Sequence, residues 1–188
     1  MAASAETPPL MATPQVRINH VPAKEGDIYK LGILSIRIIE DGSRTGSCSS
    51  VPKSFDLSSN HQWTIDNRLG AAELILPPNS SGPLPHWHEM HDEGFLVTKG
   101  AVRFHTTGLR DAKDVDCKTG DFVTVPVRAP HTFSNPFDEE ARFFNTFTPA
   151  FYVNYFKLLS EITEEGRSLQ EANKLAMAYF ATMPVAQK

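Results

Sequence analysis

The sequence predicts an all-β domain, an antiparallel sandwich or barrel, followed by C-terminal α-helices. Two observations support this prediction. Residues 61–147 contain many short runs of β-branched and aromatic residues separated by Gly and Pro, a pattern typical of antiparallel rather than parallel α/β sheets. From Thr148 onward the apolar residues recur at helical spacing. A chain of 188 residues is long enough for one domain with a sizeable core.

The N-terminal region is expected to contribute one strand between two irregular segments. Residues 1–15 are rich in Ala, Ser, Thr and Pro, which indicates a flexible tail, and they lack the basic start and apolar stretch of a signal peptide. Residues 29–41 are rich in β-branched side chains and predict a strand. Residues 41–54 contain several Gly and Ser residues and one Pro, which predicts a flexible loop.

The central region is expected to form the sheets. Each predicted strand is a short run bounded by turn residues, and no internal repeat is visible. The expected strands are residues 61–66, 71–76, 94–100, 101–106, 121–127, 131–135 and 141–147.

Two helices are expected after the strands. The first begins at Thr148 as N-cap with Pro149 in the first helical position, and it continues to residue 162. The second spans residues 168–184, where Ser168 and Glu171 have the spacing of a capping box. Its expected apolar face consists of Leu169, Ala172, Leu175, Ala176 and Tyr179.

Composition excludes several classes of partner. The net charge of −4 provides no basic surface for nucleic acid, and no apolar run approaches the length of a membrane span. The two cysteines, Cys48 and Cys117, are far apart and outside any CxxC motif, so neither a disulfide framework nor a thiolate zinc site is expected. We therefore expect a cytoplasmic protein that has neither nucleic-acid nor membrane partners.

A dense group of ionisable residues lies in the segment PHWHEMHDE, residues 85–93. Alternate residues of a strand point to the same face, so His86 and His88 can reach one point while Trp87 faces away. A hairpin would bring Glu93 back beside them. His131, on a distant segment, could add a third imidazole, and together these groups would suit a transition metal.

These segments resemble the two signature motifs of the cupin family over residues 70–147. The first motif is matched by His86, His88, Glu93 and Gly100. The second is matched by Gly120, Pro126, His131 and Asn135. The resemblance implies a double-stranded β-helix, or jelly-roll barrel, which we expect to occupy residues 16–147. The helices of residues 148–188 fall outside the resemblance and are expected to form an extension.

The resemblance also implies a metal centre with His86, His88, Glu93 and His131 as ligands. Such a centre would hold one divalent transition metal per chain, either Fe, Mn, Ni, Co or Zn, and the sequence does not choose among them. Octahedral coordination would leave two positions open. The alternative is a metal-free family member in which these residues form only a polar cluster.

The chain departs from the family pattern at two positions. Gly82 is closer to the first histidine than the usual opening glycine of the first motif, which alters the entry loop. Arg128 occupies a position usually held by glycine. Arg128 is expected to be solvated, with anchoring of an acidic substrate as the alternative.

Other candidates lie near the motifs. His91 is expected to be exposed or to lie just behind the ligands. His105 points outward if its apolar neighbours face the interior, whereas the opposite parity would make it a proton shuttle. Glu73 and Tyr152 are further candidates for acid–base roles, and Phe133 is expected to line an aromatic-rich pocket.

The leading functional hypothesis is a quercetin-dioxygenase-like enzyme that acts with O2 on an aromatic or enolic polyketide or phenolic metabolite. Glu93 would accept the proton of the substrate hydroxyl, as the resemblance suggests. One alternative is an oxygen-independent isomerase, cyclase, dehydratase or decarboxylase in secondary metabolism. Another is a non-catalytic ligand-binding protein. The resemblance also implies a homodimer.

Overall fold

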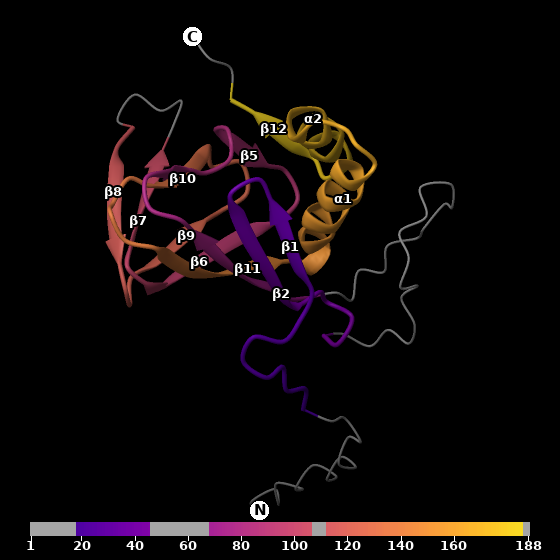
Figure 1. Ribbon diagram of the computed structural model, residues 1–188, viewed down its shortest axis with the longest axis horizontal. Helices are drawn as coiled ribbons and strands as arrows, with labels where there is room; N and C mark the ends of the chain where they lie inside the picture. The colour runs from indigo at the N-terminus through magenta and orange to yellow at the C-terminus, as the bar shows by residue number, and fades with distance from the viewer. Residues whose placement is uncertain (1–17, 46–67, 107–111, 186–188) are drawn as a thin grey trace, which may run out of the picture.

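The computed structural model describes residues 18–45, 68–106 and 112–185. The tail predicted at residues 1–15 and the strand predicted at 61–66 lie outside these residues, as does most of the loop predicted at 41–54. Figure 1 shows two β-sheets that face each other, with two helices at one end. One sheet has the order β1-β2-β3-β11-β6-β9, and the other has the order β12-β5-β10-β7-β8, with β4 also paired to β10.

The strands are short, as the punctuation of the sequence predicts. Their bounds are β1 Ile28–Leu31, β2 Leu34–Glu40, β3 Gly70–Leu76, β4 Ser80–Ser81, β5 His86–His88, β6 Asp92–Lys99, β7 Ala101–Thr106, β8 Asp114–Lys118, β9 Phe122–Val125, β10 His131–Asn135, β11 Ala141–Thr148 and β12 Thr182–Pro184. The strand pairs of both sheets are antiparallel. The prediction of an all-β antiparallel body is confirmed.

The strand predicted at residues 29–41 is in fact a hairpin. Strands β1 and β2 pair with Leu31 opposite Leu34, so only two residues form the turn. The first of these is Gly32, at φ 62°, a left-handed conformation that glycine adopts without a steric penalty. The prediction missed this turn because one glycine inside an apolar run is a weak signal.

Aromatic side chains fill the space between the sheets. Phe95, Phe104, Phe133 and Phe143 are each buried. Their ring centroids lie 5.0 to 6.4 Å apart, mostly in edge-to-face or tilted arrangements. Such geometry is favourable for aromatic pairs and contributes beyond simple burial.

The two sequence motifs meet through the pairing of the strands. In one sheet β5 pairs with β10, and His86 lies opposite His131. In the other sheet β6 pairs with β11, and Glu93 lies opposite Phe147. The histidines and the carboxylate therefore come from opposite sheets and converge on the interior.

The first C-terminal helix begins later than predicted. Thr148 is the last residue of β11, and a cis peptide bond joins it to Pro149. A 3-10 turn, η1, spans Ala150–Tyr152, and α1 follows at Val153–Glu164. The predicted N-cap at Thr148 is wrong because pairing with β6 keeps that residue in the strand.

The second helix, α2, spans Leu169–Tyr179, and its capping box between Ser168 and Glu171 is confirmed. It ends earlier than predicted, because Thr182–Pro184 forms β12 and pairs with β5. Its predicted apolar face is only partly correct. Ala172 and Ala176 are buried, whereas Leu169, Leu175 and Tyr179 are exposed.

The helices cover one end of the sheets, beside β12 and β5 and close to the β1–β2 hairpin (Figure 1). Strand β5 carries His86 and His88, so the helices and β12 cover the end of the barrel where these histidines lie. Neither of the described helices has the length and apolarity needed to cross a membrane.

Candidate metal centre

Five ionisable side chains form a buried cluster inside the barrel. His86, His88, His91, Glu93 and His131 are each between 2 and 7% exposed. His131 Nε2 lies 3.0 Å from Glu93 Oε2, and His88 Nε2 lies 3.4 Å from the same oxygen. The structure therefore brings together the four residues proposed as ligands and adds His91.

Three imidazoles are oriented by hydrogen bonds at Nδ1. His86 Nδ1 donates to the carbonyl of Leu84 at 2.7 Å, and His131 Nδ1 donates to the carbonyl of Ala129 at 2.9 Å. A carbonyl can only accept, so in the neutral rings Nδ1 carries the proton and Nε2 keeps a lone pair. His88 Nδ1 lies 3.0 Å from Thr182 Oγ1 on β12. Such backing is typical of metal-binding histidines.

The charges in the cluster depend on one another. Burial and the neighbouring histidines His131 and His88 lower the pKa of His86 to about 4. Burial alone would raise the pKa of Glu93, but the hydrogen bond with His131 and the charge interactions with His88 and His131 hold it well below its usual range. Burial lowers the pKa of His131, but its hydrogen bond and charge interaction with Glu93 and its bond to the carbonyl of Ala129 together outweigh burial, so the pKa is raised. The carboxylate is therefore ionised.

The residues fit a divalent metal ion. Two donors about 2.1 Å from one octahedral ion and at right angles to each other are about 3.0 Å apart, which matches the spacing of His131, His88 and Glu93. Among the described residues, the buried Nε2 atoms of His88 and His91 have no hydrogen-bond partner. Two groups of donor atoms within 4.8 Å of one another, His86/His88/His131 and His88/His91/Glu93, could hold an ion.

His91 is not exposed, contrary to one of the two positions expected for it. Its side chain is 2% exposed, and its Nε2 lies 3.9 Å from Glu93 Oε1. His91 and Glu93 are two residues apart around the start of β6, so both face inward while Asp92 is exposed. This alternation was the sequence signal that could have identified His91.

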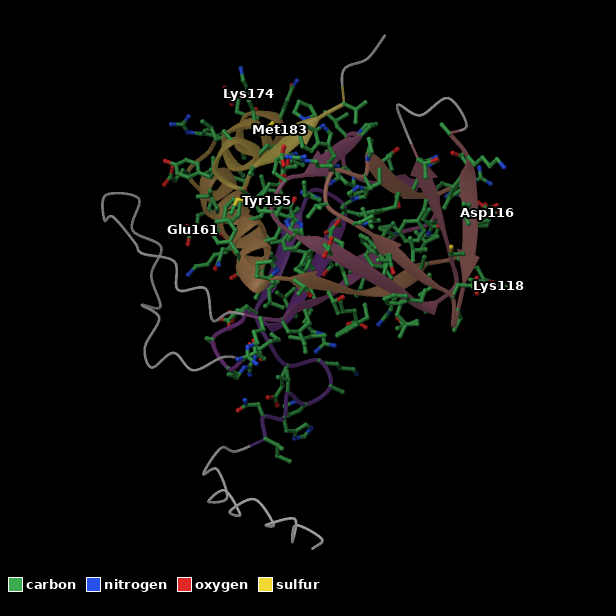
Figure 2. All side chains as sticks on the ribbon, turned by 180° about the vertical axis from the view of Figure 1, so that it is seen from behind. Asp116, Lys118, Tyr155, Glu161, Lys174 and Met183 are labelled. Carbon is green, nitrogen blue, oxygen red and sulfur yellow. The ribbon has the colours of Figure 1, made fainter. Side chains whose placement is uncertain are left out.

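A largely apolar cavity of about 300 Å³ adjoins the cluster. His86, Glu93 and His131 contribute to its wall. The remaining wall comes from the β1–β2 hairpin, the interior of the sheets and both helices. Figure 2 shows Tyr155 on the side of the helices that faces the sheets, whereas Asp116 and Lys118 lie at the far end of the molecule. The sequence did not predict that the hairpin and α2 enclose this space.

Phe133 and Tyr152 lie at the cavity, as predicted. The Tyr152 ring is stacked on His91 at 4.1 Å and lies edge-on to His88 at 4.6 Å. Burial and the nearby Tyr155 and Glu93 raise the pKa of the Tyr152 hydroxyl well above its usual value. Tyr152 is therefore a protonated phenol beside the cluster.

His105 and Glu73 do not reach the cavity. His105 lies on the outer side of β7, where its ring nitrogens bond Asp114 at 2.8 Å and Ser134 at 2.8 Å. The outward parity is confirmed, so the opposite parity, on which the proton-shuttle alternative depended, does not occur. Glu73 on β3 forms an ion pair at 3.1 Å with Arg37, its partner on the adjacent strand β2. Arg37 does not belong to the cluster. Glu73 therefore lies away from the cavity, and its acid–base role stays a prediction.

The two departures from the family pattern have clear structural settings. Arg128 is exposed, pairs with Glu89 at 2.8 Å and has φ 65°. The turn therefore keeps the conformation that glycine favours, and the solvated position expected for Arg128 is confirmed. Gly82 donates its N–H to the carbonyl of Phe133, and a Cβ there would lie 2.2 Å from that oxygen. The entry loop thus depends on a glycine at this position.

Comparison with known proteins supports the fold. Residues 72–147 match the Cupin domain family. The chain matches no curated protein. Among solved structures it is similar to KdgF from Halomonas sp., at 17% identity over 70% of this chain and 94% of that one, with a TM-score of 0.50.

Two further solved structures show weaker similarity. One is an RmlC-like cupin from Shewanella frigidimarina, at 18% identity over 70% of this chain and 92% of that one, with a TM-score of 0.47. The other is oxalate decarboxylase OxdC from Bacillus subtilis, at 16% identity over 66% of this chain and 28% of that one, with a TM-score of 0.47. Residues 72–147 thus match a cupin domain, and the two antiparallel sheets of the chain are consistent with the double-stranded β-helix fold of cupins.

Proposed function

We propose that this protein is a metal-dependent enzyme that oxygenates a small aromatic or enolic molecule, such as a polyketide or a phenolic metabolite. The observation that carries the proposal is the position of the buried His/Glu cluster at the wall of an apolar cavity. A site for structure alone would be closed by protein on every side. Here His86, Glu93 and His131 face a space that a substrate can enter.

The shape and polarity of the cavity support an aromatic substrate. A volume of about 300 Å³ is at the small end of the range for ligand pockets. Its wall includes Phe133, Tyr155 and Phe156 and is mostly apolar, while the histidines and the carboxylate of the wall, His86, His131 and Glu93, belong to the cluster. A flat molecule with one oxygen directed at the cluster would satisfy both regions.

His86, His88, Glu93 and His131 would hold the metal in this proposal. When bound, a divalent transition metal supplies Lewis acidity that favours ionisation of a substrate hydroxyl and, for a redox-active ion, reactivity toward O2. Glu93 would accept the proton released by the hydroxyl, because its carboxylate is ionised and faces the cavity. The apolar wall would exclude water from the reacting atoms.

The proposal is tested by metal content and oxygen consumption. The protein purified without added metal is expected to contain close to one equivalent of a transition metal. With a panel of flavonols and anthrones we expect metal-dependent O2 uptake. The absence of stoichiometric metal would contradict both catalytic functions, and equal turnover under strict anaerobiosis would reject the oxygenase.

A second function, oxygen-independent isomerisation, cyclisation, dehydration or decarboxylation, is favoured by Tyr152. Its hydroxyl remains protonated and its ring contacts two histidines of the cluster, so a donor and the Glu93 acceptor both adjoin the cavity. Product formation without O2 that is lost in Tyr152→Phe, with metal content unchanged, would establish this function in place of the first.

Ligand binding without catalysis is separated from both by Glu93→Gln. A protein that only binds ligand should keep nearly the same ligand affinity in this variant. Loss of turnover with retained metal would instead identify proton transfer by Glu93. The homodimer implied by the family resemblance stays a prediction, and sedimentation of the full chain would test it.

A further inference from the structure

The geometry points to His91 as a fifth protein donor to the ion of the proposed metal centre, in addition to the four motif residues. The inference rests on the proposed centre but goes beyond it, because His91 belongs to neither motif. His91 shares a group of donor atoms within 4.8 Å of one another with His88 and Glu93, both of which are also proposed ligands.

The environment of His91 leaves metal binding as the role for its Nε2. This atom is buried, and among the described residues it has no hydrogen-bond partner. The distance from His91 Nε2 to Glu93 Oε1 is 3.9 Å, which is too long for a hydrogen bond. An apolar side chain would fill the same space without burying an unpaired nitrogen.

Neighbouring aromatic rings hold the imidazole of His91 in place. Tyr152 is stacked on it with centroids 4.1 Å apart and planes 26° apart, and Phe147 lies 6.1 Å away. His88 contacts it at 4.1 Å between centroids. These contacts restrict rotation of the imidazole and keep Nε2 directed toward the carboxylate.

The two oxygens of the Glu93 carboxylate face different histidines. Its Oε2 is 3.0 Å from His131 Nε2 and 3.4 Å from His88 Nε2, whereas its Oε1 is the oxygen nearer His91. Donors on opposite sides of one ion with bonds of about 2.1 Å are about 4.2 Å apart. The 3.9 Å between His91 Nε2 and Glu93 Oε1 is within this limit.

A fifth donor changes what the site can accept. Four protein donors leave an octahedral ion two positions for outside molecules, whereas five leave one. The substrate would then bind through a single oxygen atom while His91 is coordinated. A second small molecule such as O2 would reach the ion only if one of the protein donors left it.

The test uses the full chain, freed of metal by dialysis against a chelator and titrated with Co²⁺. Co²⁺ shifts the N–H protons of coordinated imidazoles far outside the normal proton NMR range, so each coordinated histidine with a protonated Nδ1 adds one resonance that disappears in D2O. We expect four such resonances, from His86, His88, His91 and His131. The variant His91→Phe, which keeps a ring against Tyr152, is expected to show three and to bind Co²⁺ about tenfold more weakly or worse.

His105→Phe is the matched control, since His105 lies on the outer side of β7 and its loss should change neither the count nor the affinity. Three resonances in the unaltered protein would overturn the inference while leaving the metal centre intact. An unchanged count of four in His91→Phe would also overturn it. Failure of the unaltered protein to bind Co²⁺ would overturn the metal centre itself, and the inference with it.

Discussion

His131 Nε2 lies 3.0 Å from Glu93 Oε2, and this contact joins β10 of one sheet to β6 of the other. His131 also donates from Nδ1 to the carbonyl of Ala129, so the ring is held at both nitrogens. An imidazole in this position can meet the carboxylate either as a cation or through a shared metal ion. The same geometry therefore determines both the charge state of the metal-free protein and the binding of metal.

Replacing His131 by Ala should weaken metal binding by at least about 100-fold, because it removes a donor and the partner of Glu93. Calorimetric titration of the metal-free protein with Zn²⁺ measures the change. His105→Ala removes a histidine that is outside the cluster and should have the affinity of the unaltered protein. Equal affinities for the two variants would argue against His131 as a ligand.

The metal-free protein should lose stability as the pH falls from about 6.5 toward 4. The pKa of His86 is about 4 and that of His91 about 3 in the folded state, both lowered mainly by burial. In the unfolded chain both protonate near the ordinary value, so the unfolded state binds more protons in this range. Urea unfolding at pH 7 and at pH 4.5 measures the difference.

A matched variant identifies the source of this acid sensitivity. His86→Phe removes one of the two buried groups and should reduce the loss of unfolding free energy between the two pH values. Glu93, whose pKa is held low, acts in the same direction and should leave part of the effect. A pH dependence unaffected by His86→Phe would contradict the assignment to this ring.

Asn135, a residue of the second motif, stabilises the connection between sheets. Its side chain is fully buried, its Nδ2 donates to three carbonyls and its Oδ1 accepts from one N–H; the partners are Leu76, Pro77, Glu139 and Phe137. Asn135→Ala should lower the free energy of unfolding by about 3 kcal/mol, because buried partners lose their hydrogen bonds. Urea unfolding of metal-free protein measures this. Asn154→Ala, which removes one half-buried bond, should change it by about 1 kcal/mol or less.

Arg128→Gly should raise the midpoint of thermal unfolding by about 2 °C. The residue has φ 65°, which glycine adopts without the penalty that Arg incurs, and its pair with Glu89 is exposed. Arg128→Ala loses the same ion pair but keeps a Cβ, so it should show no such increase. Calorimetric scans of both variants compare the two, and a lower midpoint for Arg128→Gly would mean that the ion pair outweighs the backbone strain.

Filling the cavity should stop substrate binding without affecting the metal. Leu34 lines the cavity from the β1–β2 hairpin, and Leu34→Trp would occupy space that a substrate needs. We expect at least a tenfold increase in KM, or loss of turnover, with unchanged metal content. Ile28→Trp places the same side chain at an exposed position of β1 and should leave turnover intact. Equal kinetics for the two variants would show that substrate does not use this cavity.

Part of the fold follows from local patterns in the sequence. The alternation in β7, the run that forms β11 and the capping box at Ser168 are each specified within a few residues, and all three were predicted correctly. The errors lie where distant pairing overrides local preference. Thr148 stays in a strand because it pairs with Asp92, and Thr182 leaves the predicted helix because it pairs with His88.

The sequence by itself determined which residues resemble metal ligands. Each motif is a local spacing pattern: the first contains His86, His88 and Glu93, and the second contains His131. Only the tertiary structure decided what surrounds them. It directs His91 inward, brings Tyr152 from a C-terminal turn onto two histidines and turns His105 away into a bond with Asp114. These outcomes depend on burial and on contacts between segments far apart in the chain, which no local spacing encodes.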